Sequence, residues 1–281
     1  MPRTTLPRLL LLAAVSLAAQ NTAKKSPARD WNRPFPPHKV IGNIYSIGTA
    51  EISTFLITTQ AGHILINSDF ESTAPILRAN IETLGFKLTD VKIILGSHAH
   101  GDHMEADAML KELTAAKVMA MEQDVPALRK MTPGGKPHPI DRILKDGEEI
   151  KLGGATLKAH LTAGHTKGCT TFSMKTTEAG KSYDVVVVCS VGFNPGYVLW
   201  KNKDYPDIAD DYRRSFRTLR KLPCDIFLAA HPNFYDMEAK HPKLGKPGPH
   251  PYIDPAGYAA YIDLKEKQFQ EEFERQKSAN P

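Results

Sequence analysis

One stretch constrains the fold of this chain more than any other: an apolar run that ends in a cluster of histidines. The run 91–95, "VKIIL", has the length and the continuous apolar character of a buried strand. Directly after it, "GSHAHGDH" contains His98, His100, Asp102 and His103. Residues two apart in an extended chain point to the same side, so His98 and His100 can share one metal ion. We therefore expect a metal site at the end of a buried strand.

Two isolated histidines occur in similar surroundings further along the chain. His165 lies in "TAGHTKG" and His231 in "FLAAHPN", and each follows a predicted strand and precedes a loop. A metal site supported by the ends of strands would collect such residues, so we expect both to join the cluster. A set of imidazole and carboxylate ligands without cysteine suits zinc and leaves a coordination position for water.

The order of strand and helix signals predicts the fold class. Hydrophobic patterning predicts strands at 43–48, 53–59, 63–69, 91–95, 117–121, 156–161, 170–174, 184–189 and 225–229, and helices at 72–85, 105–115, 124–131, 208–222 and from 255 onwards. Ser72 is expected to cap the first helix and Gly85 to end it. Strands followed by helices in both halves indicate an α/β protein in which two sheets pack together with helices outside.

The N-terminus has the features of a secretory signal. Basic residues, a short apolar run and small residues follow one another in "MPRTTLPRLLLLAAVSLAAQ", and the apolar run is too short to span a bilayer. We expect three segments: a signal peptide at 1–19 with an approximate cleavage site, an extended Pro-rich lead-in at 20–39, and a single domain at 40–281. The mature protein is then expected to be periplasmic or secreted, in a bacterium, without insertion in a membrane.

Charge and cysteine content bear on the partners and on cross-links. The formal net charge of +5 includes two arginines in the signal segment, so the mature chain is only mildly basic. That charge gives no reason to expect nucleic acid as a partner, and we expect a small-molecule substrate and a monomer. Export would allow the three cysteines to pair in any of three ways. Cys169 and Cys189, near the edges of predicted strands, are the favoured pair, which leaves Cys224 as a buried thiol.

Several of these segments together resemble one known family. "SHAHGDH", "AGHTKG" and "AAHPN" look like the metal-binding motifs of the metallo-β-lactamase superfamily. The resemblance implies a four-layer αββα sandwich with the metal site at one edge of the two sheets. Four further segments, "DRILKDGEEIKLGG", "GHTKGCTTF", "NPGY" and "DYRRSF…LPCD", resemble subclass B3 of the metallo-β-lactamases. The likeness runs from about Val40 to the final helix, which is nearly all of the mature chain.

Carried over to this sequence, the resemblance implies two zinc ions and assigns ligands to each. The ligands of the first ion would be three histidines, His98, His100 and His165. The ligands of the second ion would be an aspartate and two histidines, Asp102, His103 and His231.

Position 190 bears on the choice of reaction. Superfamily hydrolases of thioesters, lactones and phosphoesters usually carry an aspartate that bridges both metals, after the strand that follows the third histidine. Here that strand, 184–189, is followed by Ser190, and a serine at this place is typical of subclass B3. The resemblance therefore implies a zinc-dependent β-lactamase of broad spectrum, carbapenems included, and leaves a dizinc lactonase or thioesterase as the alternative. A non-enzymatic zinc protein is a third hypothesis, disfavoured because structural zinc sites are usually closed and rich in cysteine.

The implied reaction is hydrolysis of the β-lactam amide by a zinc-bound hydroxide. Asp102 is the expected catalytic residue, because a water held by its carboxylate would return the proton to the leaving nitrogen. Ser190 and Asn194 are expected to bind the substrate carboxylate, with Ser190 as a water-holding residue the equal alternative. The pairing of Cys169 with Cys189 also matches a disulfide found in some members of the subclass.

Residues outside the motifs carry further expectations. His38 lies in Pro-rich, polar surroundings and is expected to be solvated. Asn67, at the end of "HILIN", is expected to support the metal ligands by hydrogen bonding. Trp31, Phe35 and the loop 123–138 are expected to wall the substrate pocket.

Overall fold

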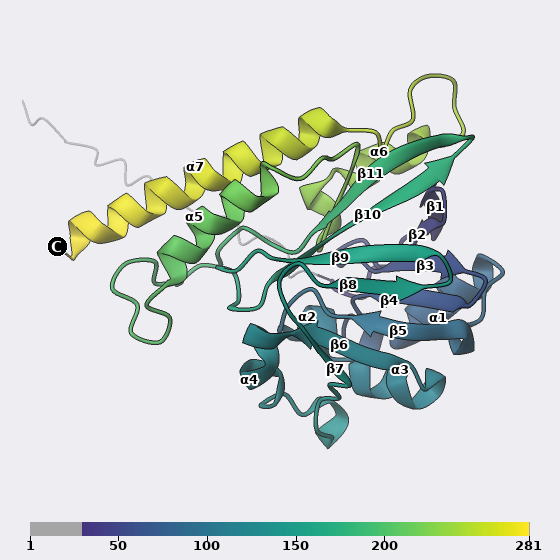
Figure 1. Ribbon diagram of the computed structural model, residues 1–281, viewed down its shortest axis with the longest axis horizontal. Helices are drawn as coiled ribbons and strands as arrows, with labels where there is room; N and C mark the ends of the chain where they lie inside the picture. Colours follow the sequence, from purple (N-terminus) through teal and green to yellow (C-terminus); the bar gives the residue numbers. More distant parts are fainter. Residues whose placement is uncertain (1–29, 281) are drawn as a thin grey trace, which may run out of the picture.

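The computed structural model describes residues 30–280 and shows two β-sheets packed face to face between two layers of helices (Figure 1). The four-layer αββα sandwich expected from the sequence is thus confirmed. The signal peptide expected at 1–19 lies outside the described residues, as does the first part of the lead-in, 20–29. Among the described helices, none is both long and apolar enough to cross a membrane.

Within residues 30–280 the strands form a seven-stranded and a five-stranded sheet. The first sheet consists, in spatial order, of β1 (His38–Ile41), β2 (Ile44–Ser46), β3 (Phe55–Thr59), β4 (Gly62–Ile66), β5 (Val91–Leu95), β6 (Lys117–Met121) and β7 (Arg142–Leu144). The second consists of β12 (Ile226–Ala229), β11 (Lys181–Val188), β10 (Thr170–Glu178), β9 (Ala155–Leu161) and β8 (Glu149–Leu152). Strands β4 to β7 are parallel, as are β11 and β12, and the other neighbouring pairs are antiparallel.

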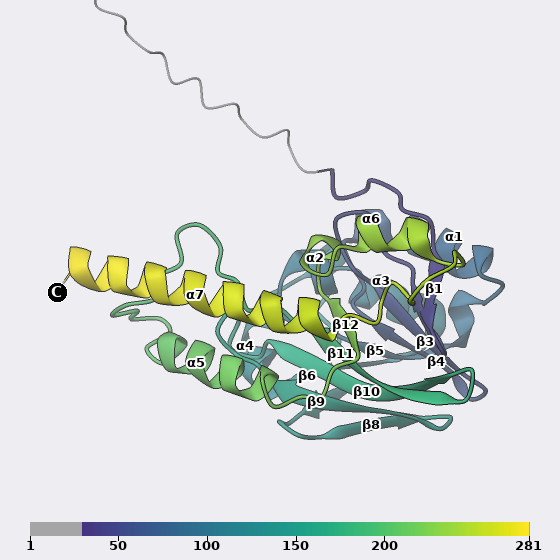
Figure 2. The same ribbon diagram turned by 90° about the horizontal axis from the view of Figure 1, so that it is seen from above.

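The longer helices cover the outer faces of the sheets. They are α1 (Ala74–Thr83), α3 (Asp107–Thr114), α5 (Ile208–Leu219) and α7 (Pro255–Ala279). Helices α1 and α3 pack on the first sheet, and α5 and α7 lie side by side on the second (Figures 1 and 2). Three short helices lie in connections: α2 (Gly101–Met104), α4 (Val125–Leu128) and α6 (Met237–Lys240). Asp254 caps α7 by accepting a hydrogen bond from the Gly257 amide.

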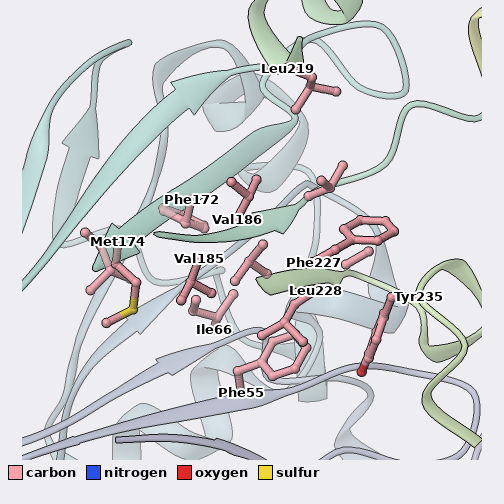
Figure 3. Packing of buried hydrophobic residues seen from close by; sticks show 14 of the residues in the cluster. Phe55, Ile66, Phe172, Met174, Val185, Val186, Leu219, Phe227, Leu228 and Tyr235 are labelled. Atoms are coloured by element: carbon pink, nitrogen blue, oxygen red, sulfur yellow. The ribbon is translucent and has the colours of Figure 1, made fainter. Parts of the chain in front are cut away.

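The main core fills the space between the two sheets (Figure 3). Phe55 and Ile66 of the first sheet lie opposite Val185 and Leu228 of the second, and all four side chains are fully buried. Burial of a side chain of this size stabilises the fold by about 1.5–3 kcal/mol. This core holds the two sheets in a fixed relation, and with them the loops at their shared edge.

The strand directions decide where the histidine loops gather. The loops that carry the predicted ligands follow β5 in the first sheet and β9 and β12 in the second. Strand β9 runs in the same direction as β11 and β12, because β10 is antiparallel to both β9 and β11. The carboxyl ends of strands that run the same way meet at one edge of a sheet. The predicted ligands of both sheets therefore reach a common edge.

Some details of the expected pattern are wrong. The helix α1 begins at Ala74, and the Ser72 hydroxyl does not cap it but donates to Asn32 Oδ1 over 3.3 Å. A short 3₁₀ turn at Glu71–Thr73 precedes the helix and removes Ser72 from the cap position. The strands β1, β7 and β8 were not among the expected ones. Each has only three or four residues and lies at the edge of a sheet.

Candidate metal centre

The three histidines expected to hold one ion lie close together. His98 and His100 follow β5, and His165 comes from the loop between β9 and β10. The ring centroids are 4.7 Å apart for His98 and His100, 4.7 Å for His98 and His165, and 4.8 Å for His100 and His165. One ligand atom of each residue lies within 4.8 Å of those of the other two. The structure thus brings these three side chains into one potential coordination sphere.

The second expected set is also assembled, directly beside the first. Asp102 Oδ2 lies 3.2 Å from His103 Nε2 and 3.6 Å from His231 Nε2. The rings of His103 and His231 are 4.9 Å apart, although the two residues come from different sheets. The His98 and His103 rings are 4.2 Å apart and join the two sets.

Two of the histidines are oriented by backbone carbonyls on the side away from the cluster. His165 Nδ1 donates to the carbonyl of Gly192 over 2.8 Å, and His231 Nδ1 donates to that of Glu51 over 2.9 Å. Such a bond fixes the proton on Nδ1 and leaves Nε2 unprotonated. Both side chains therefore present a metal-ligating nitrogen to the centre.

One buried atom tests whether the cluster fits a metal ion. His98 Nε2 is buried and has no hydrogen-bond partner within the described residues. A buried polar atom without a partner costs free energy, which coordination to a metal ion would offset. The orphaned nitrogen faces a group of imidazoles and a carboxylate, which is a donor set that zinc accepts. These residues fit a metal ion.

The electrostatics of the site favour the ligating forms of its side chains. Burial, together with the neighbouring histidines, lowers the pKa of His98 well below its usual value and that of His165 to about 3, although the bond to the Gly192 carbonyl opposes the shift of His165. Burial opposes ionisation of Asp102, yet the combined effect of His103 and the other imidazoles holds its pKa below the usual value. Neutral imidazole and ionised carboxylate are the states that bind a metal.

A carboxylate outside the cluster ties the two histidine loops together. Asp124 is buried and accepts hydrogen bonds from the amides of Ala99 at 2.8 Å and Gly168 at 2.7 Å, and from the Thr166 hydroxyl at 2.8 Å. Ala99 lies between His98 and His100, and the other two donors flank the loop of His165. A side-chain carbon at position 168 would come within 2.7 Å of Asp124 Cβ, so only glycine allows this approach.

Asn67 and a disulfide give further support. Asn67 Oδ1 accepts from the Ser97 amide at 3.0 Å, and its Nδ2 donates to the Ser53 carbonyl at 3.1 Å. The asparagine thus fixes the residue before the first histidine, as its position in the sequence suggested. Cys169 and Cys189 form a disulfide that joins the start of β10 to the end of β11, and Cys224 is free.

An open cavity of about 610 Å³ lies over the cluster. Ser190 and Asn194, the residues expected to bind the substrate, both line it. The remaining lining residues are Trp31, Phe70, His100, Gly101, Asp102, His165, Gly192, Phe193, His231, Asn233, Phe234 and Lys265. Trp31 was expected in this wall, and its ring contacts Phe70 at 5.6 Å.

Other expectations about the pocket wall are wrong. Phe35 does not line the cavity but packs against the rings of His38 and His241. Within the described residues the loop 123–138 also stays outside the lining, because it folds back on α2 and α3. His38 is buried rather than solvated, since Phe35, His241 and Tyr252 pack against its ring.

Comparison with known proteins identifies the family. The family model described as the metallo-β-lactamase superfamily matches residues 47–231, which include all six predicted ligands. The chain belongs to the metallo-β-lactamase superfamily. In this superfamily the cluster marks a metal site, usually for zinc, and membership supports a hydrolase.

Solved structures of this superfamily resemble the chain over most of its length. The FEZ-1 metallo-β-lactamase from Legionella gormanii is 41% identical with a TM-score of 0.85, over 89% of this chain and 99% of that one. LRA-12, a class B3 di-zinc metallo-β-lactamase from an Alaskan soil metagenome, is 33% identical with a TM-score of 0.81, over 88% and 97% of the two chains. The expected resemblance to subclass B3 is confirmed.

Curated sequence relatives match over a shorter region. Hydroxyacylglutathione hydrolase from Methylococcus capsulatus is 28% identical over 62% of this chain and 59% of its own length. A probable metallo-hydrolase from Burkholderia pseudomallei is 30% identical over 54% of this chain and 53% of its own. The chain thus spans little more than half the length of these relatives.

Two charged residues at the site were not found by sequence reasoning. Asp124 sits in "EQDVPAL", where no neighbouring motif indicates that its carboxylate reaches the histidine loops. Lys265 lies in the middle of α7, far along the chain from every metal motif, and appears beside them only through the packing of that helix. Helical periodicity alone gives no signal for either role.

Proposed function

We propose that the protein is a zinc-dependent β-lactamase of broad spectrum, carbapenems included, which opens the β-lactam amide. The extent of the structural likeness carries this proposal. The match to FEZ-1 covers 99% of that β-lactamase at 41% identity, whereas the match to hydroxyacylglutathione hydrolase covers 59% of that enzyme at 28% identity. Ser190 at the end of β11, where thioester hydrolases of the superfamily usually carry a bridging aspartate, supports the same choice.

The proposal includes two zinc ions, as in the di-zinc relative LRA-12. The ligands of one ion would be His98, His100 and His165, and those of the other Asp102, His103 and His231. Zinc bound there would polarise the amide carbonyl and lower the pKa of water to about 7, which supplies the nucleophile at neutral pH.

The protein's own side chains would orient the substrate and move the proton. Hydrolysis adds the hydroxyl of water to the carbonyl carbon and its proton to the nitrogen of the broken C–N bond. Asp102, whose pKa is held below its usual value, stays ionised, so its carboxylate can hold a water that returns this proton. Ser190 and Asn194 both line the cavity, and a hydroxyl and a side-chain amide could donate to the carboxylate beside the β-lactam nitrogen.

The alternative is a dizinc lactonase or thioesterase of the same superfamily. The names of the curated relatives favour it, since the Methylococcus protein is a hydroxyacylglutathione hydrolase. The metal cluster alone does not separate the two reactions, because either can use the same nucleophile. The substrate has to be tested directly.

The test measures turnover of a carbapenem, a cephalosporin, a glutathione thioester and a homoserine lactone by the zinc-loaded mature protein, with and without a chelator. We expect opening of both β-lactams, abolished by the chelator and restored by zinc. A matched pair of variants distinguishes the effect of losing a histidine of the cluster from that of losing a buried histidine elsewhere. His98→Gln should abolish turnover, whereas His160→Gln should keep it, because the His160 ring bonds to Ser173 on β10 and is not part of the cluster. Turnover of the thioester or the lactone without turnover of either β-lactam would overturn the proposal.

A further inference from the structure

The cavity over the metal cluster contains one cation that none of the motifs explains. Among the described residues that line the cavity, Lys265 of α7 is the only lysine or arginine. The side chain is half-buried, and burial lowers its pKa. No carboxylate of the described residues lies within ion-pair distance of its ammonium, and its one hydrogen bond goes to Gln268 Oε1 at 3.2 Å. An ammonium has three donors, so donors remain for another acceptor.

Two neighbours of Lys265 each contact a histidine of the cluster, one from each expected set of ligands. On one side, its Nζ lies 5.5 Å from the ring centroid of Phe234, whose ring is 5.2 Å from that of His231. On the other side, a side-chain carbon built on Gly192 would lie 3.7 Å from the same Nζ, and the Gly192 carbonyl holds His165. The ammonium is therefore close to a residue that contacts His231 and to a residue that holds His165.

Lys265 contacts Gln268 and two aromatic rings but no anion, and a half-buried cation without an anionic partner carries a desolvation cost that a bound anion would offset. The cavity already holds polar donors on the same wall, Ser190 and Asn194, and these are acceptable partners for a carboxylate. Beyond Lys265 the wall continues along α7 into a second groove lined by Gln268, Glu271, Glu272 and Arg275. In that groove Arg275 is already paired with Glu272, so the unpaired positive charge is at the cavity end.

We propose that Lys265 is the anion-binding residue of the metal cavity and selects substrates that carry a carboxylate next to the scissile amide. The assignment of the anion as the β-lactam carboxylate rests on the proposed function. The anion site itself rests only on the position and the unpaired charge of Lys265.

A binding experiment tests the anion site without any turnover. The probes are mercaptoacetate and 2-mercaptoethanol, two small thiols that differ in the presence of a carboxylate, titrated calorimetrically into the zinc-loaded protein. The variant is Lys265→Gln. Lys267→Gln is the matched control, because Lys267 lies on the same helix but is exposed and faces Glu271. We expect Lys265→Gln to reduce the preference for mercaptoacetate over 2-mercaptoethanol about tenfold, and Lys267→Gln to leave it unchanged.

A kinetic experiment tests the link to the substrate. It compares a cephalosporin with its methyl ester and reports the ratio of the two kcat/KM values. We expect Lys265→Gln to lower this ratio about tenfold, mainly through KM of the acid, and Lys265→Arg to restore most of it. Loss of packing against Phe234 alone would lower kcat/KM for both compounds and leave the ratio unchanged.

The outcomes separate this inference from the proposed function. If no β-lactam is hydrolysed but Lys265→Gln still loses its preference for mercaptoacetate, the proposed function fails and the anion site stands. If the preference for mercaptoacetate is the same in Lys265→Gln, Lys267→Gln and the unchanged protein, with equal zinc content, the inference is overturned whatever the protein hydrolyses.

Discussion

Asp124 shows how a residue that touches no substrate can determine a metal site. Its two carboxylate oxygens accept from two backbone amides, those of Ala99 and Gly168, and from one hydroxyl. A hydroxyl can act as a hydrogen-bond donor or as an acceptor, but an amide N–H can only donate. Both oxygens are therefore required as acceptors to hold the loop of His98 and His100 against the loop of His165.

The variant Asp124→Asn should weaken both the fold and the metal site. Its NH₂ group would face a backbone N–H, which leaves a buried donor unsatisfied and costs about 1–3 kcal/mol of unfolding free energy. We expect zinc affinity, measured by competition with a chelator, to fall about 10- to 100-fold. Asp141→Asn is the control, because Asp141 accepts from the Val118 amide at 2.8 Å but lies away from the cluster. Zinc affinity that falls equally in both variants would contradict this role.

His38 should make the fold sensitive to acid. Burial lowers its pKa to about 4, while the bond to the Pro36 carbonyl opposes this shift and the nearby His241 adds to it. The neutral ring donates from Nδ1 to Pro36 and accepts at Nε2 from the Tyr252 hydroxyl over 2.6 Å. The unfolded pKa is about 6.5, so as pH falls from 6.5 to 4 the unfolded chain binds one more proton than the folded one. The unfolding free energy should then fall by about 1.4 kcal/mol per pH unit over that window.

The variant His38→Gln removes this proton and should flatten the pH dependence by the same slope. The measurement is urea unfolding between pH 4 and 7 in the presence of a chelator, so that metal ligands contribute equally to both proteins. Parallel curves for the two proteins would show that His38 does not couple to folding.

At the residue scale, functional residues could be predicted where they form a cluster or a periodic pattern in the sequence. Contacts that arise only when distant segments pack together could not. The expected ligands could be predicted because four of them fall within 98–103 and the other two follow predicted strands. Asp124 and Lys265 could not be predicted in this way. Each is a single charged residue, on a short turn or a long helix, and its neighbours in the sequence do not indicate which distant residues it contacts. His38 failed for the same reason: its polar, Pro-rich neighbours predict exposure, but residues more than 200 positions away bury it.

At the scale of elements, the missed strands share a position in the sheets. Strands β1 and β7 form the two edges of the first sheet, and β8 forms one edge of the second. Edge strands are often short, and three or four residues give too few alternations for a pattern to register. The central strand β5 could be predicted because four of its five residues are buried and apolar, and only Lys92 is exposed.

The disulfide is a prediction at this scale, because it joins the start of β10 to the end of β11 beside the metal loops. Its partners are 20 residues apart, and closing a loop of that size stabilises the fold by about 3 kcal/mol in the chain-entropy description. We expect Cys169→Ala/Cys189→Ala to lose about that much unfolding free energy. Dithiothreitol should lower the melting temperature of the unchanged protein and of Cys224→Ala, but not that of the double variant. A melting temperature insensitive to the reductant in all three would contradict the cross-link.

At the scale of the whole molecule, the metal centre joins the two sheets. His98, His100, Asp102 and His103 follow a strand of the first sheet, whereas His165 and His231 follow strands of the second. A bound ion would therefore add a cross-sheet link at the edge, where the apolar core between the sheets ends. These six residues come together only if the two sheets pack as a sandwich. Their pattern in the sequence therefore indicates the fold as well as the metal site.

Metal removal should accordingly destabilise the entire fold rather than one loop. A ligand that binds only the folded state at 100 times its dissociation constant stabilises by about 2.7 kcal/mol, which for a domain of this size raises the melting temperature by about 5–10 °C. We expect a shift of that order between chelated and zinc-saturated protein, growing with zinc concentration. His98→Gln and His231→Gln, one from each sheet, should both reduce the shift. His160→Gln, a buried histidine bonded to Ser173 instead, should retain it. An equal shift in all three variants would place the stabilising zinc elsewhere, since a link between the sheets at this edge requires a ligand from each of them.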